Sequence, residues 1–448
     1  MQTASKKVIN GWAMYDWANS VYNLVITSTI FPAYYSAITD DKNAATVDQV
    51  RFLGRTFESS SLYNYVLGFG FLIVAIMSPV LSSIADYKGN KKTFLRFFCT
   101  LGSLGCAGLY FFKDLDTLYI GIICSIIACV GFWSSIVFYN SYLPEIAPPE
   151  QRDAVSAKGF SMGYMGSVLM QLICFVFVFK PEWFGMENDS TLPPRFCFLM
   201  VGLWWFGFAQ ITLFRLPKGV PAAHRPEYNV LSNGFIELKK VFTELTHHPL
   251  LKRFLFSFFF YNMGVQTIML VATLFGSKEL NLPTEKLILT ILIIQLVAIA
   301  GAWTMAKLSE KFGNIKTLIV VVMIWICLCI SAYYISILHD RQVNVELYFY
   351  ILAAVVGLVM GGIQSLSRST YSKLMPVTKD TTSYFSFFDV TEKIAIVIGM
   401  FSFGIITELT QSMKNSILAL TLFFVIGLLL LFYTLAKEKQ LRKLSTTP

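Results

Sequence analysis

A chain of 448 residues that is 55% hydrophobic and only 14% charged cannot cover a water-soluble surface, so its composition indicates a polytopic membrane protein. The net charge of +9 does not indicate nucleic-acid binding, because the basic residues lie mainly in loops between apolar segments, where membrane insertion favours them. The eight cysteines lack ligand spacing and the four histidines lie in loops, so the sequence predicts no metal site and no cofactor.

Twelve apolar segments follow one another along the chain, and each can cross a hydrocarbon core that needs about 20 helical residues. They lie near residues 12–38, 59–84, 94–112, 117–143, 156–180, 195–217, 251–276, 287–309, 315–338, 345–374, 383–407 and 415–436. We therefore predict an all-α polytopic membrane protein with two pseudo-symmetric six-helix bundles. The bundles are residues 1–217 and 251–448, the second with a short cytoplasmic tail, and a cytoplasmic loop at 218–250 joins them.

The positive charges predict an orientation for these segments. Most of the 36 lysines and arginines fall in loops on the same side of the membrane as the N-terminus. Cytoplasmic loops carry such an excess, so we expect both termini in the cytoplasm. We expect the chain to be a monomer in the lipid bilayer of a bacterial plasma membrane.

The first span carries a polar face. Four side chains recur at helical spacing in the stretch WAMYDWANSVYNLVITSTIFPAYY, namely Trp12, Asp16, Asn19 and Asn23. An ionisable group at the centre of a membrane helix costs about 2.5 kcal/mol or more, so such groups usually line a polar path. We predict that Asp16, Asn19 and Asn23 line the substrate path. The alternative is that Asp16 snorkels to the cytoplasmic end and only anchors the helix.

A loop motif occurs twice, as SSIADYKGNKK after the second span and as AKLSEKFGNIK after the eighth. At a constant offset, Asp86 and Gly89 correspond to Glu310 and Gly313. Such a repeat indicates two parallel halves with a substrate site between them. The acid can bond to a helix N-terminus or pair with a cation, so we predict a conformational latch at both loops. The alternative is a solvated, positively charged loop.

These loops are similar to the signature of the major facilitator superfamily, G-x-x-x-D-[RK]-x-G-[RK]-[RK], from which Ser82, Tyr87 and Asn90 depart. Four stretches resemble the Atg22-like branch of that superfamily: YDWANSVYNLVITSTIFPAYY, NSYLPEIAPPEQRDAVSAKGFSMGYMG, YNMGVQT and GGIQSLSRSTYSKLMP. The resemblance covers nearly the whole chain. It implies the twelve-helix fold of the superfamily and suggests amino-acid export, the activity of the fungal vacuolar effluxer in this branch.

Span seven repeats the Tyr-Asn pair of span one, with Asn262 in the place of Asn23. Asn262 and Gln266 lie on an uncharged polar face, and we predict that both line the substrate path. In the Atg22-like branch an acid commonly follows the Tyr-Asn pair, whereas this chain has Met263. The resemblance therefore does not supply a proton site in this span.

Span ten carries Gln364 and Arg368 behind Gly361 and Gly362, which suggest a break in the helix. We predict that Gln364 and Arg368 belong to the substrate path. Arg368 either pairs with a substrate carboxylate or snorkels to the cytoplasmic interface.

The loop behind span four contains Glu145 and Arg152, and a similar neighbourhood surrounds Pro376 in the second half. The duplication suggests an inner gate, with an ordinary surface pair as the alternative.

Span eleven places three charges in an otherwise apolar run, SYFSFFDVTEKIAIVIGM. Asp389 and Lys393 have the spacing and order of a helical ion pair, and Glu392 lies close enough to compete for the same ammonium. Two carboxylates that share one cation leave a net negative charge, so one of them can take up a proton. We predict that Asp389, Glu392 and Lys393 couple transport to protons, whereas the alternative is a purely structural pair.

The sequence contains no phosphate-binding loop and no sizeable soluble domain, so transport must draw on a gradient rather than on ATP. We therefore predict a secondary transporter, not an enzyme, that moves a small polar organic solute such as an amino acid by alternating access, coupled to protons. The alternatives are a membrane-embedded lipid-handling protein (a scramblase or an enzyme), an exporter of drugs or other metabolites, and a receptor-like relic without transport.

Overall fold

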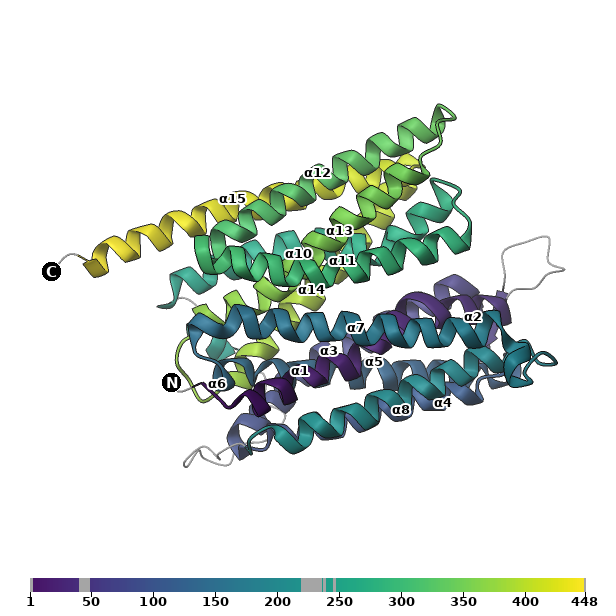
Figure 1. Cartoon of the computed structure of the whole chain (residues 1–448), viewed down its shortest axis with the longest axis horizontal. Helices are drawn as coiled ribbons and strands as arrows, with labels where there is room; N and C mark the ends of the chain where they lie inside the picture. Colours follow the sequence, from purple (N-terminus) through teal and green to yellow (C-terminus); the bar gives the residue numbers. More distant parts are fainter. Residues whose placement is uncertain (1–2, 40–48, 219–235, 237–238, 245–246, 447–448) are drawn as a thin grey trace. The chain divides into compact units, whose positions relative to one another are not determined.

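The computed structural model describes residues 3–39, 49–218, 236, 239–244 and 247–446 (Figure 1). The first half of the sequence contains α1 (Lys6–Val21), a π-helical turn η1 (Tyr22–Thr29), α2 (Ile30–Thr39), α3 (Ser59–Lys88), α4 (Lys91–Gly108), α5 (Leu118–Asn140), α6 (Leu143–Ile146), α7 (Arg152–Phe179) and α8 (Leu192–Arg215). The second half contains α10 (Pro249–Lys278), α11 (Thr284–Phe312), α12 (Asn314–Asp340), α13 (Glu346–Leu374), α14 (Thr381–Thr410) and α15 (Met413–Thr446).

The predicted all-α membrane fold is confirmed. In the described part of the chain, 11 helices are by themselves long and apolar enough to cross a membrane. The first span is the twelfth crossing, because α1, η1 and α2 follow one another without interruption from Lys6 to Thr39. Each expected apolar segment coincides closely with one of these crossings.

A proline explains why the first span departs from a regular α-helix. Pro32 has no backbone N–H, and its ring would crowd the preceding turn of an α-helix. The chain widens into a π-helix over Tyr22–Thr29, at whose end the N–H of Ile30 bonds to the carbonyl of Val25, five residues back. Side chains before and after this turn therefore do not share the register of one uninterrupted α-helix.

The chain packs as two compact units, which differ from the two halves of the sequence. The C-terminal unit contains Ile236–Pro448 together with Tyr142–Ser161 and Met1–Ala4. The N-terminal unit contains Ser5–Ser141 and Met162–Phe235. Helix α7 therefore contributes its first turns, up to Ser161, to the C-terminal unit and its remainder to the N-terminal unit.

Within the C-terminal unit, α11 and α13 approach each other closely. A Cβ atom on Gly361 of α13 would lie 2.1 Å from the carbonyl oxygen of Ala298 on α11, so only glycine fits there. Helix α13 runs without interruption from Glu346 to Leu374. The break that the sequence suggests at Gly361 and Gly362 is therefore wrong, because the glycines serve close packing rather than a bend.

The loop between the first two spans contains a hairpin that was not predicted from the sequence. Strands β1 (Gln49–Phe52) and β2 (Arg55–Glu58) pair antiparallel. Two residues with positive φ, Leu53 at 48° and Gly54 at 76°, form the turn between them. The turn gives little sequence signal, because leucine replaces the asparagine or glycine that usually occupies such a position.

Candidate functional site

Asp16 lies inside the N-terminal unit, where α1 packs against α5. Asp16 is 8% exposed, and its carboxylate accepts a hydrogen bond from the hydroxyl of Tyr139 at 2.7 Å. Trp12 stacks on the same tyrosine with ring centres 4.5 Å apart, and its Nε1 donates to the Tyr139 carbonyl at 3.0 Å. Asp16 therefore does not snorkel to a helix end, while its role in the substrate path stays a prediction.

The polar face predicted for span one does not continue through the π-helical turn. Trp12, Asp16 and Asn19 are buried, whereas Asn23 in the turn is exposed. Asn19 accepts a long hydrogen bond of 3.4 Å from Ser20, and its Nδ2 atom has no partner among the described residues. The expectation of one continuous face is therefore wrong, because the wider turn changes the helical register.

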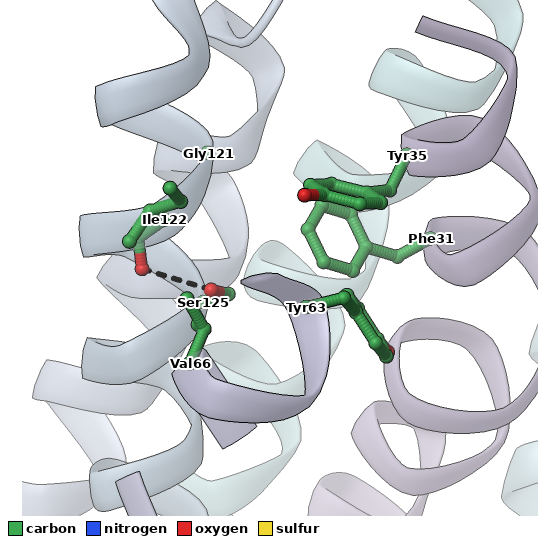
Figure 2. A pocket seen from close by; sticks show the side chains of 7 residues that line it. All are labelled: Phe31, Tyr35, Tyr63, Val66, Gly121, Ile122 and Ser125. Atoms are coloured by element: carbon green, nitrogen blue, oxygen red, sulfur yellow. Dashed lines mark hydrogen bonds between the residues drawn. The ribbon is translucent and has the colours of Figure 1, made fainter. Parts of the chain in front are cut away.

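A small aromatic recess lies between α2, α3 and α5 of the N-terminal unit (Figure 2). It is lined by Phe31, Tyr35, Tyr63, Val66, Gly121, Ile122 and Ser125. The hydroxyl of Tyr35 donates to the Ser59 carbonyl at 3.1 Å, and that of Ser125 donates to the Ile122 carbonyl at 2.8 Å. The recess therefore offers mainly apolar and aromatic surface, and it contains none of the residues predicted for the substrate path.

The first copy of the loop motif forms a tight helix end. Gly89 has φ of 59°, a conformation that costs glycine little, and the next N–H, of Asn90, bonds back to the Ala85 carbonyl at 3.1 Å. Asp86 is half-buried at this end of α3. Lys91 is buried and donates to the carbonyl of Ser141 at 3.4 Å, so this part of the loop packs against the end of α5.

The second copy of the loop motif has a different conformation. Gly313 has φ of 91° between α11 and α12. Glu310 is exposed, and the structure shows no hydrogen bond or ion pair between its side chain and another described residue. The neighbouring Asn314 makes the polar contacts of this loop instead, so a latch role for Glu310 stays a prediction.

Asp153, in the first turn of α7, is the centre of a buried polar cluster in the C-terminal unit. Its carboxylate accepts hydrogen bonds from Ser309 of α11 at 2.7 Å, from Asn314 of α12 at 2.8 Å and from Lys373 of α13 at 2.5 Å. Lys373 also donates to Asn314 at 2.9 Å. These four residues connect the segment Tyr142–Ser161 to three helices.

Arg368 of α13 lies beside the next turn of α7 and is 4% exposed. Its Nε and Nη2 atoms donate to the hydroxyl and the carbonyl of Ser156 at 2.9 and 2.8 Å, and its guanidinium lies 4.2 Å from the centre of the Phe160 ring. The snorkelling alternative for Arg368 is therefore wrong. Its predicted role in the substrate path stays open, as does that of the half-buried Gln364 one turn earlier.

Arg152 and Glu145 do not form a surface pair. Arg152 is buried and donates to three main-chain carbonyls, those of Ala147 at 3.0 Å, Pro144 at 3.2 Å and Ser372 at 2.5 Å. Glu145 instead accepts a hydrogen bond from Thr381, the first residue of α14, at 3.0 Å. Both side chains join the segment Tyr142–Ser161 to the helices of the second half of the sequence.

The three charges of span eleven form the contacts that their spacing predicts. Lys393 Nζ lies 2.9 Å from Asp389 and 3.7 Å from Glu392, and the side chains of Asp389 and Lys393 are almost fully buried. Gln266 of α10 donates to Glu392 at 2.7 Å. A residue predicted for the substrate path thus contacts a residue predicted for coupling.

The polar face of α10 lies inside the C-terminal unit. The hydroxyl of Tyr261 hydrogen-bonds to that of Ser367 on α13 at 2.8 Å. Asn262 and Thr267 are also buried, and their Nδ2 and Oγ1 atoms have no partner among the described residues. Such buried atoms usually mark a bound water, a ligand or a group that moves.

Four functional candidates were not predicted from the sequence, namely Asp153, Ser156, Asn314 and Lys373. Asn314 belongs to the repeated loop motif, so the repeat contained a signal for it. Asp153 follows Arg152 in the region suggested as a gate, but its partners lie 156 to 220 residues away in the sequence. Spacing along one helix could not predict those contacts.

Solved structures with the same arrangement of helices are membrane transporters. FucP, a major facilitator superfamily transporter in the outward conformation, matches with a TM-score of 0.68 and 12% identity over 96% of this chain and 99% of that chain. A bacterial homologue of the iron transporter ferroportin in the outward-facing state matches with a TM-score of 0.67 and 12% identity over 96% and 98%. The twelve helices therefore have the fold of a major facilitator superfamily transporter.

Relatives by sequence narrow this class to one family. The MFS-type transporter YxiO of Bacillus subtilis is 29% identical over 429 residues, which cover 95% of this chain and 94% of YxiO. Autophagy-related protein 22 of Kluyveromyces lactis is 26% identical over 492 residues, covering 99% and 96%. The family model described as "Vacuole effluxer Atg22 like" matches residues 4–444. The chain belongs to this Atg22-like family, and it is a membrane transporter rather than an enzyme.

Proposed function

We propose that this transporter moves a small polar organic solute by alternating access and that it draws energy from a proton gradient. The observation that supports the proposal best is the charge cluster of α14, in which Asp389 and Glu392 share the single ammonium of Lys393 inside a membrane-spanning helix. A buried cluster of this kind costs free energy in a membrane, which is typical of groups that carry out transport.

Glu392 is the residue that we assign to proton uptake. Asp389 and Lys393 neutralise each other at 2.9 Å, whereas Glu392 lies farther from the ammonium, at 3.7 Å, and its side chain is 18% exposed. The ionised cluster carries a net charge of minus one, and a proton on Glu392 makes the cluster neutral. The uncharged amide of Gln266 contacts Glu392 from α10.

Protonation of Glu392 changes its contact with α10. The bond from Gln266 to an ionised carboxylate is charge-assisted, and such bonds are stronger than bonds between neutral groups. Loading a proton therefore weakens the connection between α14 and α10. We propose that this step links the proton to the movement of these helices.

The segment Tyr142–Ser161 is the part of the chain that we propose as an inner gate. It comes from the first half of the sequence, yet Asp153 and Arg152 bond it to helices of the second half. Alternating access requires such contacts to form in one state and break in the other. We propose that the repeated loops, with Asp86, Gly89, Glu310 and Gly313, assist this gate as a latch.

An amino acid is the cargo class that we propose, in the direction of efflux. The family description names a vacuole effluxer, and the predicted path supplies amides from Asn23 and Asn262, which can both donate to and accept from a zwitterion. The relative from Bacillus subtilis supports a bacterial plasma membrane as the location. We propose that the chain acts as a monomer with both termini in the cytoplasm.

The test is a solute screen in proteoliposomes with an imposed pH gradient. We expect uptake of at least one labelled amino acid, and we expect Glu392→Gln to flatten its dependence on pH. The matched control is Glu408→Gln, which removes an exposed carboxylate from the far end of the same helix and should leave the pH profile unchanged. An unaltered profile in Glu392→Gln would remove Glu392 from coupling, and transport of lipid probes alone would overturn the proposed cargo class.

A further inference from the structure

The π-helical turn of span one exposes two polar side chains, Asn23 and Ser28. Leu24, Val25 and Ile26 are buried, whereas Asn23 is exposed and the structure shows no hydrogen bond from its amide to a described residue. π-Helical turns in membrane and soluble helices occur frequently at functional sites. The turn therefore places an available amide near the middle of the first span.

Two hydroxyl groups make hydrogen bonds that fit the five-residue spacing of this turn. Ser28 donates to the carbonyl of Asn23, and Thr29 donates to that of Leu24, each five residues back and at 2.8 Å. Thr29 differs from Ser28 because it also contacts another helix. Its Oγ1 atom lies 2.7 Å from Oε1 of Gln171 on α7, within the N-terminal unit.

Gln171 is a polar residue at a buried position of α7. It is 1% exposed, and its Nε2 atom has no hydrogen-bond partner among the described residues. A threonine hydroxyl has one proton, which cannot serve both the Leu24 carbonyl and Gln171. The amide satisfies more bonds when its nitrogen donates to Thr29 and Thr29 donates to Leu24.

In either orientation, Gln171 uses only part of its hydrogen-bonding capacity. A buried amide that is partly unsatisfied costs stability that an apolar side chain would avoid. The one hydrogen bond that its side chain makes to a described residue is to the last residue of the π-helical turn. That contact ties the register of the turn to α7.

We propose that Thr29 and Gln171 are positioning residues that hold the π-helical turn and thereby keep the Asn23 amide directed toward the polar groups of the cargo. This inference rests on the proposed transport function and adds to it a specificity element in the first span. The π-helical turn is wider than an α-helical turn by one residue. If it became α-helical, one part of the span would rotate against the other by about 100°. Asn23 would then turn toward the buried face.

The experiment measures the orientation of position 23 without any cargo. Asn23→Cys is made in a Cys327→Ser background, which removes the exposed native cysteine, and its rate of labelling by a membrane-impermeant maleimide is measured in proteoliposomes. We expect Thr29→Val and Gln171→Leu each to slow labelling by about tenfold, because burial slows thiol reactions. The double variant should be no slower than either single variant.

Two further variants distinguish a positioning role from general damage to the fold. Thr29→Ser keeps the hydroxyl and should restore the labelling rate, and Ser28→Ala, which loses a bond only within its own helix, should label at the original rate. Pro32→Ala should also slow labelling, because it removes the reason for the π-helical turn. Unchanged labelling in Thr29→Val and Gln171→Leu, or an equal loss in Thr29→Ser, would overturn the proposal. These outcomes do not depend on transport, so they are separate from the test of the proposed function.

Discussion

Removing the charge of Asp153 should release the segment Tyr142–Ser161. Asp153→Asn keeps the shape of the side chain but leaves Lys373 without the carboxylate that it contacts at 2.5 Å. Breaking a buried ion pair by removing one partner costs about 3–5 kcal/mol. The side chain of Lys373 is 22% exposed, so the pair is only partly removed from water. We therefore expect a smaller loss, about 2 kcal/mol, which corresponds to a shift of about 30-fold in a two-state equilibrium.

Hydrogen exchange of residues 142–161 in lipid nanodiscs measures this loss. The expected result is exchange about 30-fold faster in Asp153→Asn, because the segment opens more often from α11, α12 and α13. Lys373→Gln should have a similar effect, and combining the two changes should add little. The matched control is Glu150→Gln, which removes the same charge from an exposed position of the same segment. Equal exchange in Asp153→Asn and the parent protein would refute the reasoning, as would an equal effect of Glu150→Gln.

Three further predictions concern the spans and the repeated loops. Asp16→Asn should leave the protein folded and lower transport by about tenfold or more, measured in proteoliposomes, and normal transport would limit Asp16 to a structural role. Lys393→Ala leaves Asp389 and Glu392 without their shared ammonium, so it should abolish transport or lower the thermal stability, and a variant with parental activity and melting temperature would contradict this. Asp86→Ala and Glu310→Ala should shift the balance between inward-open and outward-open states, and identical cysteine accessibility on both faces would leave only the solvated-loop interpretation.

Local patterns predicted the features that depend on neighbouring residues in one helix. The spans follow from hydropathy, because every membrane crossing must bury its own backbone bonds in an apolar run. The contacts of Asp389, Glu392 and Lys393 follow from helical spacing alone. The two glycines of span ten were misread for the same reason. A local pattern cannot distinguish a helix break from a helix that needs glycine at Gly361 to approach α11.

Features that depend on distant residues were not predictable from spacing. Asp153 and Lys373 are 220 residues apart in the sequence, and only the packing of α7 on α13 brings them together. The π-helical turn had a local signal in Pro32, but a proline is also compatible with a kink in a regular helix. The turn decides which residues of span one are exposed, so the polar face predicted there was wrong beyond Asn19.

The internal repeat gives the two halves the same spans but different polar sites. The Tyr-Asn pair of span one lies at the start of a π-helical turn, and Asn23 is exposed there. The same pair in span seven lies in the regular helix α10, where Asn262 is buried and Tyr261 bonds to Ser367. Span seven has no proline to widen its helix, since the described α10 contains proline only at its first residue, Pro249. The ionisable cluster of Asp389, Glu392 and Lys393 lies in the second half of the sequence, next to α10. We therefore propose a division of roles, in which span one presents a fixed amide to the cargo while α10 and α14 respond to the proton.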